Sequence, residues 1–365
     1  MKQKKIIIFM PSIEGGGVEK NLHLITNFLC SKLDEIKLIT TSNNTEKINK
    51  KIKIINNKFL SSISINRFLK IIFSSIFLIF ELMKSKNFVV FSFQANLFAI
   101  LISKFFRKKI IIRLNSSPSG WLNNFIKKKI FQKIYSLADV VIVNSQQFKK
   151  ELWSEIKVKS FCIYNPLDKK NILKKAKKII KDNPFKKRKS LKIINIGRLV
   201  DQKDQLTLLK SINYLKNDIK IEAIIIGQGR NEIILKDYIR EKNLEKIIKI
   251  LNFQKNPYPY IKLSDVFILT SLYEGLPNVL LEAITLKKSV ISSDCKTGPK
   301  EILNYGKAGT LFKTGSYKDL SKKIIRFTKN KKENTKMRKI AFKSLKKYDY
   351  NKNLREYLKK IQEIN

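Results

Sequence analysis

The sequence has little of what most metal and redox sites are built from. It contains one histidine, His23, and three cysteines, Cys30, Cys162 and Cys295, which lie far apart and form no CxxC or CxH pattern. This spacing disfavours a structural zinc site or a disulfide framework and favours a reducing compartment. A single imidazole also excludes mechanisms that need several histidines, including most catalytic zinc sites.

Long apolar runs are missing as well. The most apolar stretch, residues 71–80, is bounded by Lys70 and Glu81 and is only about half of the ~20 residues that cross a bilayer. Residues 1–9 hold lysines and then a short apolar run before Pro11, a pattern that predicts a buried first strand and no signal peptide. We therefore expect a cytoplasmic protein without a transmembrane helix.

Acidic residues are scarce: 29 Asp and Glu stand against 76 Lys and Arg, which gives a formal net charge of +47. Only 10 of the basic residues are arginines, and the excess is spread along the whole chain. A nucleic-acid surface would concentrate arginines beside stacking aromatic residues, so a nucleic-acid-binding protein is the disfavoured alternative and no specific nucleic acid is expected. The charge still predicts attraction to phosphates and to anionic lipid surfaces.

The sequence does contain a regular alternation of short β-branched runs and longer helical stretches. Its 365 residues, 43% of them hydrophobic, suffice for two domains. The alternation breaks in a lysine-rich stretch and restarts at Leu191, which predicts an α/β protein with two Rossmann-like β/α/β domains facing each other across a cleft. The expected parts are a first domain over residues 1–165, a linker over 166–190, a second domain over 191–345, and a C-terminal helix over 346–365 that packs back on the first domain.

The candidate site is expected in the loops that follow the strands, because open parallel sheets bind ligands at the carboxyl ends of their strands. The expected strands are Lys5–Met10, Lys37–Thr40, Phe88–Phe93, Ile110–Leu114, Val140–Asn144, Lys192–Ile196, Ile221–Ile226, Ile248–Leu251, Val266–Leu269, Ser289–Ser292 and Thr310–Phe312.

A glycine loop, Gly15-Gly16-Gly17 followed by Val18 and Glu19, comes directly after the first expected strand and opens a helix. Glycines let a ligand approach the main chain, and a helix N-terminus favours negative charge. A tight turn explains the same glycines equally well. The dinucleotide fingerprint needs a third glycine where Lys20 stands, so NAD binding is disfavoured.

A second set of residues follows the first strand of the second domain, where Lys203 comes five residues after Gly197-Arg198. A guanidinium and an ammonium at a strand–helix junction suit a diphosphate, because arginine can bond two oxygens and lysine adds a compact charge. The alternative is two more cations in a lysine-rich chain. Gly227-Gln228-Gly229 repeats this strand-end pattern and predicts room for a ligand beside the main chain.

The most informative segment is 271–283, in which Glu274 lies in a loop and Glu282 in a helix that starts near Pro277 and Asn278. Buried carboxylates are costly unless they are hydrogen-bonded, and sugar and ribose hydroxyls are natural donors to them. The backbone N–H groups near Leu276–Val279 would receive a phosphate or a sugar oxygen. The alternative is one surface glutamate and one that complements a helix dipole.

Together, Gly16-Gly17-Val18-Glu19, Gly197-Arg198 with Lys203, and Glu274 with Glu282 resemble the retaining, nucleotide-sugar-dependent glycosyltransferases of family 4 with the GT-B fold. The resemblance runs from Ile6 to about Tyr350. Residues 293–303 are similar to a bacterial subgroup that builds lipopolysaccharide, exopolysaccharide and lipid-linked oligosaccharides. A GT-B enzyme of other chemistry, such as an epimerase or a phosphorylase, is the second alternative.

The resemblance implies a role for each matched residue. Arg198, Lys203 and Glu274 would be catalytic, with the cations on the donor diphosphate and Glu274 on the donor sugar. Relatives often carry a histidine where Asn115 stands, so a histidine base is not expected, and His23 is expected to pack or face solvent. The donor would be held by Gly16, Gly17, Gly197, Gly229, Leu276, Pro277, Asn278, Val279 and, at the ribose, Glu282, and the acceptor side would hold Glu19, Arg113 and Asn115.

The chain has no DxD motif, so no metal and no cofactor are expected. The resemblance implies a nucleotide-sugar donor, UDP-hexose or UDP-N-acetylhexosamine, as the co-substrate. The expected acceptor is a glycan, free or lipid-linked. Residues 66–84 and 122–135 predict amphipathic helices, the second with Lys127-Lys128-Lys129, and two interpretations stay open for both: a helix packed in the core, or a basic helix on an anionic membrane. The second interpretation would make the protein peripheral on the cytoplasmic face of the inner membrane.

Overall fold

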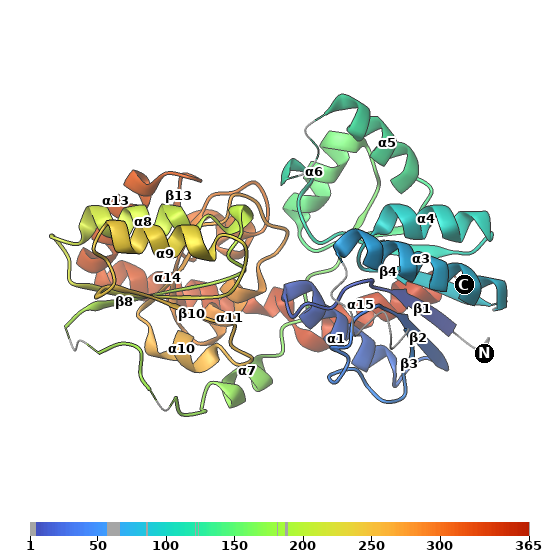
Figure 1. The fold of residues 1–365 in the computed structure, drawn as a ribbon, viewed down its shortest axis with the longest axis horizontal. Helices are drawn as coiled ribbons and strands as arrows, with labels where there is room; N and C mark the ends of the chain where they lie inside the picture. Colours follow the sequence, from blue (N-terminus) through green and yellow to red (C-terminus); the bar gives the residue numbers. More distant parts are fainter. Residues whose placement is uncertain are drawn as a thin grey trace. The chain divides into compact units, whose positions relative to one another are not determined.

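The computed structural model describes residues 5–56, 66–84, 87–120, 122, 124–180, 182–186 and 189–364. The chain divides into two compact units, of which the first takes residues 1–166 together with 350–365 and the second takes residues 167–349. Each unit has one parallel sheet covered by helices on both faces (Figure 1). The prediction of an α/β chain with two Rossmann-like domains is confirmed.

The first unit has a seven-stranded sheet in the order β3-β2-β1-β4-β5-β6-β7. Its central strands consist of apolar residues buried on both faces, as expected for a parallel sheet covered on both sides. The edge strands β3 and β7 were not expected, because three and two partly exposed residues are too few to form a hydrophobic pattern. The strands are β1 Lys5–Phe9, β2 Glu35–Ile39, β3 Lys53–Ile55, β4 Phe88–Ser92, β5 Ile110–Arg113, β6 Val140–Val143 and β7 Phe161–Cys162.

The helices of the first unit cover the two faces of this sheet with separate clusters of apolar side chains. Helices α1 and α15 pack on one face, and α3, α4, α5 and α6 pack on the other (Figure 1). Their bounds are α1 Gly17–Leu29, α3 Arg67–Lys84, α4 Asn96–Phe105, η1 Pro118–Gly120, α5 Phe125–Tyr135, α6 Gln146–Ile156 and α15 Tyr350–Glu363.

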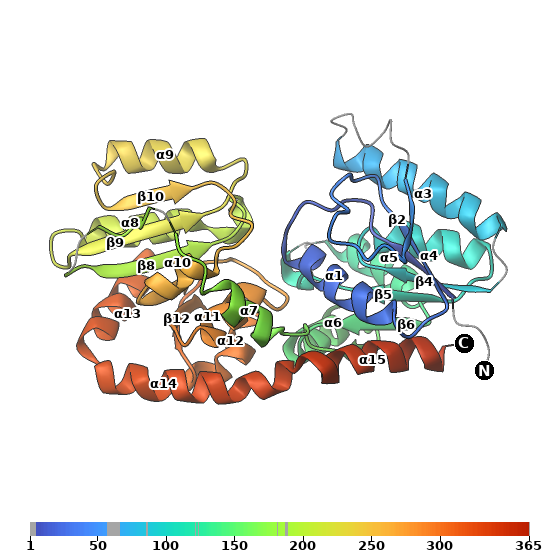
Figure 2. The ribbon, with the colours of Figure 1, turned by 90° about the horizontal axis from the view of Figure 1, so that it is seen from below.

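Helix α15 belongs to the core of the first unit although it comes from the far end of the sequence (Figure 2). Its buried side chains Leu354, Tyr357 and Ile361 follow helical spacing and join the cluster that holds Ile6 of β1 and Leu22 of α1. The polypeptide therefore crosses between the two units twice, after Pro166 and before Tyr350.

The second unit has a six-stranded sheet in the order β10-β9-β8-β11-β12-β13. Strands β8, β9 and β10 follow one another toward one edge of the sheet, and β11, β12 and β13 follow one another toward the other edge. The strand order therefore reverses between the neighbours β8 and β11. The strands are β8 Leu191–Ile196, β9 Ile221–Ile226, β10 Ile248–Leu251, β11 Val266–Leu269, β12 Ser289–Ser293 and β13 Thr310–Phe312. Their positions agree closely with the expected ones, because β-branched or apolar residues dominate most of them and lie at the centre of β12.

The helices of the second unit also cover both faces of its sheet. Leucines and isoleucines of α8, α9 and α13 form the core on one face. The elements are α7 Lys169–Lys175, η2 Asp201–Lys203, α8 Gln205–Leu215, α9 Glu232–Glu241, α10 Tyr258–Leu263, α11 Asn278–Thr285, α12 Pro299–Ile302, η3 Asn304–Gly306, α13 Tyr317–Lys329, α14 Lys331–Ser344 and η4 Leu345–Tyr348.

The stretch expected as a solvated linker, residues 166–190, is in large part folded into the second unit. Asp168 accepts a hydrogen bond from Asn171 N at 3.0 Å and caps α7, and Ile172 is 1% exposed. Phe185 is buried as well. The sequence does not reveal α7, because its many exposed lysines leave too few apolar residues for a helical pattern. Residues 181, 187 and 188 lie outside the described residues.

Candidate active site

The candidate site lies at the carboxyl ends of β8 and β11, where the strand order of the second unit reverses. Such a switch point is where open α/β sheets bind ligands. The loop after β8 carries Lys203 and the loop after β11 carries Glu274, and their side chains meet: Lys203 Nζ lies 2.5 Å from Glu274 Oε1. Both are largely buried, with side chains 17% and 8% exposed, so little solvent screens the pair.

The backbone around Lys203 is fixed by its neighbours. Lys203 ends the turn η2, and its carbonyl oxygen accepts a hydrogen bond from Thr270 Oγ1 at 2.8 Å. Asp204 follows in the left-handed conformation, with φ of 45°, and caps α8 by accepting hydrogen bonds from Thr207 N and Oγ1. Burial raises the pKa of the Asp204 carboxyl above its usual value. The lysine is thus presented from a tight turn with defined geometry.

Glu274 is held by hydroxyl groups that the sequence analysis did not single out. Ser271 Oγ donates to Glu274 Oε1 at 2.7 Å, Thr297 Oγ1 donates to the Glu274 carbonyl oxygen at 2.5 Å, and Ser293 Oγ donates to the Ser271 carbonyl oxygen at 2.6 Å. Thr297 and Ser293 come from β12 and the loop after it. Their signal in the sequence is only their position at a strand end, since hydroxyl residues are common in loops.

Gly298 lets the loop after β12 approach the loop that carries Glu274. Its φ is +83°, and a Cβ at this position would lie 2.4 Å from the carbonyl oxygen of Gly275. Only glycine combines this backbone conformation with this contact. The two loops are therefore packed backbone to backbone next to the ion pair.

Glu282 is buried on α11, at 5% exposure. Its helix begins after Pro277, and no side chain caps it. The positive end of the helix dipole therefore lies at Asn278 and Val279, which are partly exposed, while Leu276 is buried. This end suits a negatively charged or oxygen-rich group.

Arg198 has an exposed side chain after Gly197 and forms no ion pair within the part of the chain that the structure describes. Its carbonyl oxygen accepts a hydrogen bond from Gln205 Nε2 at 3.0 Å, which fixes the backbone there. Gly229 lies in the neighbouring loop, but a Cβ on it would be 2.4 Å from the carbonyl oxygen of Leu199. Gly229 is thus required because the backbone of Leu199 packs against it, and not because a ligand does.

The glycine loop of the first unit is covered by a carboxylate from the first turn of α1. Glu19 is 8% exposed; its Oε1 accepts a weak hydrogen bond from Glu14 N at 3.4 Å, and a Cβ on Gly16 would lie 2.9 Å from its Oε2. Gly17 opens α1, and its carbonyl oxygen accepts a hydrogen bond from Asn21. A carboxylate at the start of α1 complements the helix dipole and disfavours a second anion there.

Two residues expected on the acceptor side differ in exposure. Arg113 is 0% exposed, so its side chain makes contact with the protein alone, whereas Asn115 is partly exposed at the carboxyl edge of the sheet. The two are hydrogen-bonded to each other. His23 is half-buried on α1, and burial together with Lys47 lowers its pKa to about 4.

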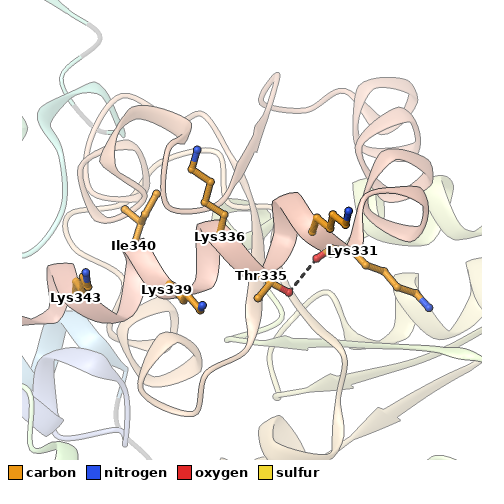
Figure 3. A pocket seen from close by; sticks show the side chains of 7 residues that line it. Lys331, Thr335, Lys336, Lys339, Ile340 and Lys343 are labelled. Carbon is orange, nitrogen blue, oxygen red and sulfur yellow. Dashed lines mark hydrogen bonds between the residues drawn. The ribbon is translucent and has the colours of Figure 1, made fainter.

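Two further features lie away from the switch point. A pocket of about 520 Å³ lies on α14, where the lysine side chains extend outward in several directions and Thr335 bonds to the carbonyl oxygen of Lys331 (Figure 3). Within the described ranges, no three histidine, cysteine or acidic side chains come close enough to hold a metal ion. Among the same residues, no helix is long and apolar enough to cross a bilayer. The pocket is lined by Lys331, Lys332, Thr335, Lys336, Lys339, Ile340 and Lys343.

Comparison with known proteins places the switch-point residues inside a recognised sequence family. Residues 160–344 match the family described as glycosyl transferases group 1. An uncharacterized glycosyltransferase of Methanocaldococcus jannaschii is 33% identical over 263 residues, which are 62% of this chain and 63% of that protein. The match thus spans slightly less than two thirds of that relative.

A second relative is matched over most of both chains. It is N-acetylgalactosamine-N,N'-diacetylbacillosaminyl-diphospho-undecaprenol 4-alpha-N-acetylgalactosaminyltransferase of Campylobacter jejuni, 28% identical over 325 residues, which are 84% of this chain and 86% of that protein. Among solved structures, Anabaena HepE in complex with UDP and glucose is similar with a TM-score of 0.79 and 16% identity, covering 99% of this chain and 100% of that one. At this identity, the structural likeness shows the shared fold.

Proposed function

This chain belongs to the glycosyl transferases group 1 family, and from that premise we propose that it moves a sugar from a nucleoside diphosphate sugar to a hydroxyl of a growing glycan. The observation that carries the proposal is the Lys203–Glu274 ion pair at the switch point of the second sheet, beside the uncapped start of α11. A cation and a helix N-terminus suit the donor's phosphates, and a buried carboxylate suits its hydroxyls.

The difficult step is the break between the anomeric carbon and the phosphate oxygen, because negative charge grows on the departing diphosphate. Fixed positive groups aimed at that charge are the most effective catalytic device. In our proposal Lys203 and the exposed Arg198 supply this charge, and turnover proceeds without a divalent cation. Glu274 uses Oε1 for Lys203 and Ser271, so Oε2 receives a donor-sugar hydroxyl, and Glu282 receives the ribose hydroxyls.

We propose that the transfer retains the configuration at the anomeric carbon. The bond from that carbon to the phosphate oxygen breaks, and a bond to the acceptor oxygen forms on the same face. The departing phosphate oxygen takes the acceptor's proton, so the nucleoside diphosphate leaves with that proton and no protein base is consumed. Glu274 orients the sugar in this scheme and forms no covalent bond with it.

The names of similar proteins support a UDP-linked sugar and a lipid-linked or surface glycan as substrates. The Campylobacter jejuni relative is named for a diphospho-undecaprenol-linked acceptor, and a relative of Staphylococcus aureus for capsular polysaccharide biosynthesis. Solved structures of similar fold hold UDP or UDP-glucose. We propose UDP-N-acetylhexosamine or UDP-hexose as donor and a polyprenyl-diphosphate-linked glycan as acceptor.

A lipid-linked acceptor requires the enzyme to work at a membrane surface, and three neighbouring helices of the first unit suit such a surface. Helices α3, α4 and α5 pack side by side on one face of the sheet (Figure 1). The ammonium of Lys129 lies 4.6 Å from the ring centre of Phe125, within the basic run 127–129. Their exposed apolar side chains are Phe68, Leu69, Ile76, Phe80 and Met83 on α3, Phe98, Leu101 and Phe105 on α4, and Phe125, Ile126 and Ile130 on α5.

Both interpretations of residues 66–84 and 122–135 stay open, because α3 buries Leu78 and Leu82 and α5 buries Tyr135, while the large apolar side chains just named are exposed. Contiguous exposed apolar side chains are a mark of interaction surfaces. We propose that this surface, with its lysines, rests on the anionic cytoplasmic face of the inner membrane, which makes the protein peripheral.

The function is tested by nucleotide release. UDP-N-acetylglucosamine, UDP-N-acetylgalactosamine, UDP-glucose and UDP-galactose are each incubated with the protein, with and without a polyprenyl diphosphate that carries one N-acetylhexosamine. We expect UDP release and an elongated glycan only with acceptor present. Release without acceptor would favour an epimerase-type reaction, and phosphate-dependent formation of sugar 1-phosphate would favour a phosphorylase. No thermal stabilisation by any UDP-, GDP- or ADP-sugar would refute the donor assignment.

A further inference from the structure

The guanidinium of Arg113, at the end of β5, lies among neutral groups in the interior of the first unit. It donates hydrogen bonds to Asn115 Oδ1, to Asn165 Oδ1 at 2.6 Å and to Tyr357 Oη at 2.9 Å. Its central carbon lies 5.8 Å from the ring centre of Phe93. The partners come from the loops after β4 and β5, from the last residues before the first crossing between the units, and from α15 after the second.

No carboxylate forms an ion pair with Arg113 among the residues that the structure describes. A buried charge without a countercharge costs folding free energy, and apolar residues of similar volume usually stabilise such a position at least as well. Stability therefore explains this arrangement poorly. What the guanidinium does to its partners is the better explanation.

Its effect on Asn115 follows from hydrogen-bond chemistry. A guanidinium can only donate, so Asn115 must turn its amide oxygen toward Arg113. The amide nitrogen then donates to the carbonyl oxygen of Phe93 at 2.7 Å, as the structure shows. The second N–H of this nitrogen makes only a long contact of 3.5 Å with the carbonyl oxygen of Arg113, so it is the N–H that Asn115 offers at the carboxyl edge of the sheet, where ligands of such sheets bind.

We propose that Arg113 is a positioning residue, which orients the Asn115 carboxamide as a hydrogen-bond donor to an oxygen of the acceptor glycan. This inference rests on the proposed function for the identity of the ligand. Arg113 acts only through Asn115, and Tyr357 and Asn165 hold the guanidinium in place. Helix α15, from the opposite end of the chain, thereby helps to shape the first unit's ligand-binding edge.

Two matched substitutions separate positioning from stability. Asn115→Asp and Asn165→Asp each place a carboxylate at an oxygen that already accepts from Arg113, so each gives the buried guanidinium a countercharge. We expect the melting temperature of each variant to equal or exceed that of the wild type. A favourable ion pair between Arg113 and the new carboxylate would raise it by roughly 2 °C or more. Only Asn115→Asp removes the N–H donor at the edge of the sheet.

Transfer is then measured with UDP-N-acetylglucosamine, or whichever UDP-sugar the wild type uses, and the polyprenyl-diphosphate acceptor. Asn165→Asp should keep the wild-type rate. Asn115→Asp should lose roughly 10- to 100-fold in kcat/KM for the acceptor, the worth of one hydrogen bond to a buried ligand, with KM for the donor unchanged. Equal activity of the two variants, or equal loss in both, would overturn the positioning role.

A measurement without substrate keeps this inference apart from the proposed function. In protein labelled with ¹⁵N-asparagine, the Asn115 side-chain amide signals are identified by their absence from Asn115→Asp. Tyr357→Phe removes one acceptor of the guanidinium and should shift these signals, while Tyr238→Phe in the second unit should leave them in place. Unmoved signals in Tyr357→Phe would refute the orientation by Arg113. A wild type that transfers no sugar, with shifted signals, would refute the proposed function alone.

Discussion

Lys203 Nζ and Glu274 Oε1 lie 2.5 Å apart, and Ser271 Oγ donates to the same carboxylate oxygen at 2.7 Å. The cation proposed for the donor's phosphates and the acid proposed for its sugar are thus bound to each other. A diphosphate must compete with Glu274 for the lysine, whereas a complete sugar nucleotide gives each partner a new contact. If the proposed roles hold, we expect the pair to favour the intact donor over the spent nucleotide.

Removing one charge at a time tests this competition. In Glu274→Gln the lysine loses its anionic partner, so we expect UDP to bind a few-fold more tightly, a change of about 1 kcal/mol. Sugar transfer should fall by about 10²-fold or more, because the donor sugar loses its carboxylate. Isothermal titration with UDP and steady-state transfer assays measure the two effects.

Lys203→Met is the complementary variant and should weaken UDP binding and transfer together. Lys236→Met on α9, an exposed lysine paired with Glu232, serves as the matched control and should change neither. Weaker UDP binding by Glu274→Gln would contradict the competition. Wild-type transfer by Lys203→Met would remove the lysine from the mechanism.

The contact between Gly298 and Gly275 predicts a second effect. Gly298→Ala should lose stability and activity together, because its Cβ would collide with the carbonyl oxygen of Gly275 next to Glu274. Gly315 offers a matched control, since its φ is +75° and no atom lies within 4 Å of the position of a Cβ. Gly315→Ala should cost only about 1 kcal/mol of left-handed backbone strain and leave activity intact.

Urea unfolding and transfer assays on both glycine variants decide this point. The packing argument predicts a clearly larger loss in the free energy of unfolding for Gly298→Ala than for Gly315→Ala. Equal losses would show that backbone conformation alone matters at Gly298. The loop of Glu274 would then have room to shift.

The sequence predicts every strand except the edge strands β3 and β7, and it places Lys203 and Glu274 after strands of the second sheet, because these features have local signals. Runs of β-branched residues mark the central strands, and residues that follow strands in neighbouring positions must meet at the same edge. The supporting hydroxyls of Ser293 and Thr297 have no such signal, since their value depends on loops that meet only in the folded chain.

Arg113 and Glu19 show a different limit of sequence reasoning. Both have charged side chains near strand ends, a pattern that favours contact with a ligand. In the fold Arg113 points into the unit toward Tyr357 of α15, which lies 244 residues away from it in the chain. Glu19 covers Gly16. The direction of a side chain is decided by tertiary contacts, which local patterns do not record.

His23 predicts how stability depends on pH. Burial and the nearby Lys47 lower its pKa from 6.5 to about 4 in the folded protein. Between these values the unfolded chain binds the proton more strongly than the folded chain, so the free energy of unfolding should fall as pH drops from 6.5 toward 4. His23→Gln should flatten this slope in urea titrations at several pH values, and an unchanged slope would assign the pH dependence to other groups.

The outer face of α5 predicts lipid binding that depends on two kinds of side chain. Phe125, Ile126 and Ile130 are 68%, 65% and 48% exposed beside Lys127-Lys128-Lys129. We expect the wild type to co-sediment with vesicles that contain phosphatidylglycerol more than with neutral ones, since each lysine near an anionic surface contributes about 1 kcal/mol. Replacing the three apolar residues by serine should weaken binding to both kinds of vesicle, because α5 loses its apolar contact while the exposed side chains of α3 and α4 and the lysines remain.

Replacing the three lysines by glutamine should instead lower only the preference for anionic lipid, because the apolar contact remains. The control is Ile233→Ser with Ile234→Ser on α9, two exposed apolar residues of the second unit at 72% and 58% exposure. That variant should bind vesicles like the wild type. Equal loss of binding in the α5 and α9 variants would mean that exposed apolar groups anywhere suffice, and the assignment of the membrane to the α3–α5 face would fail.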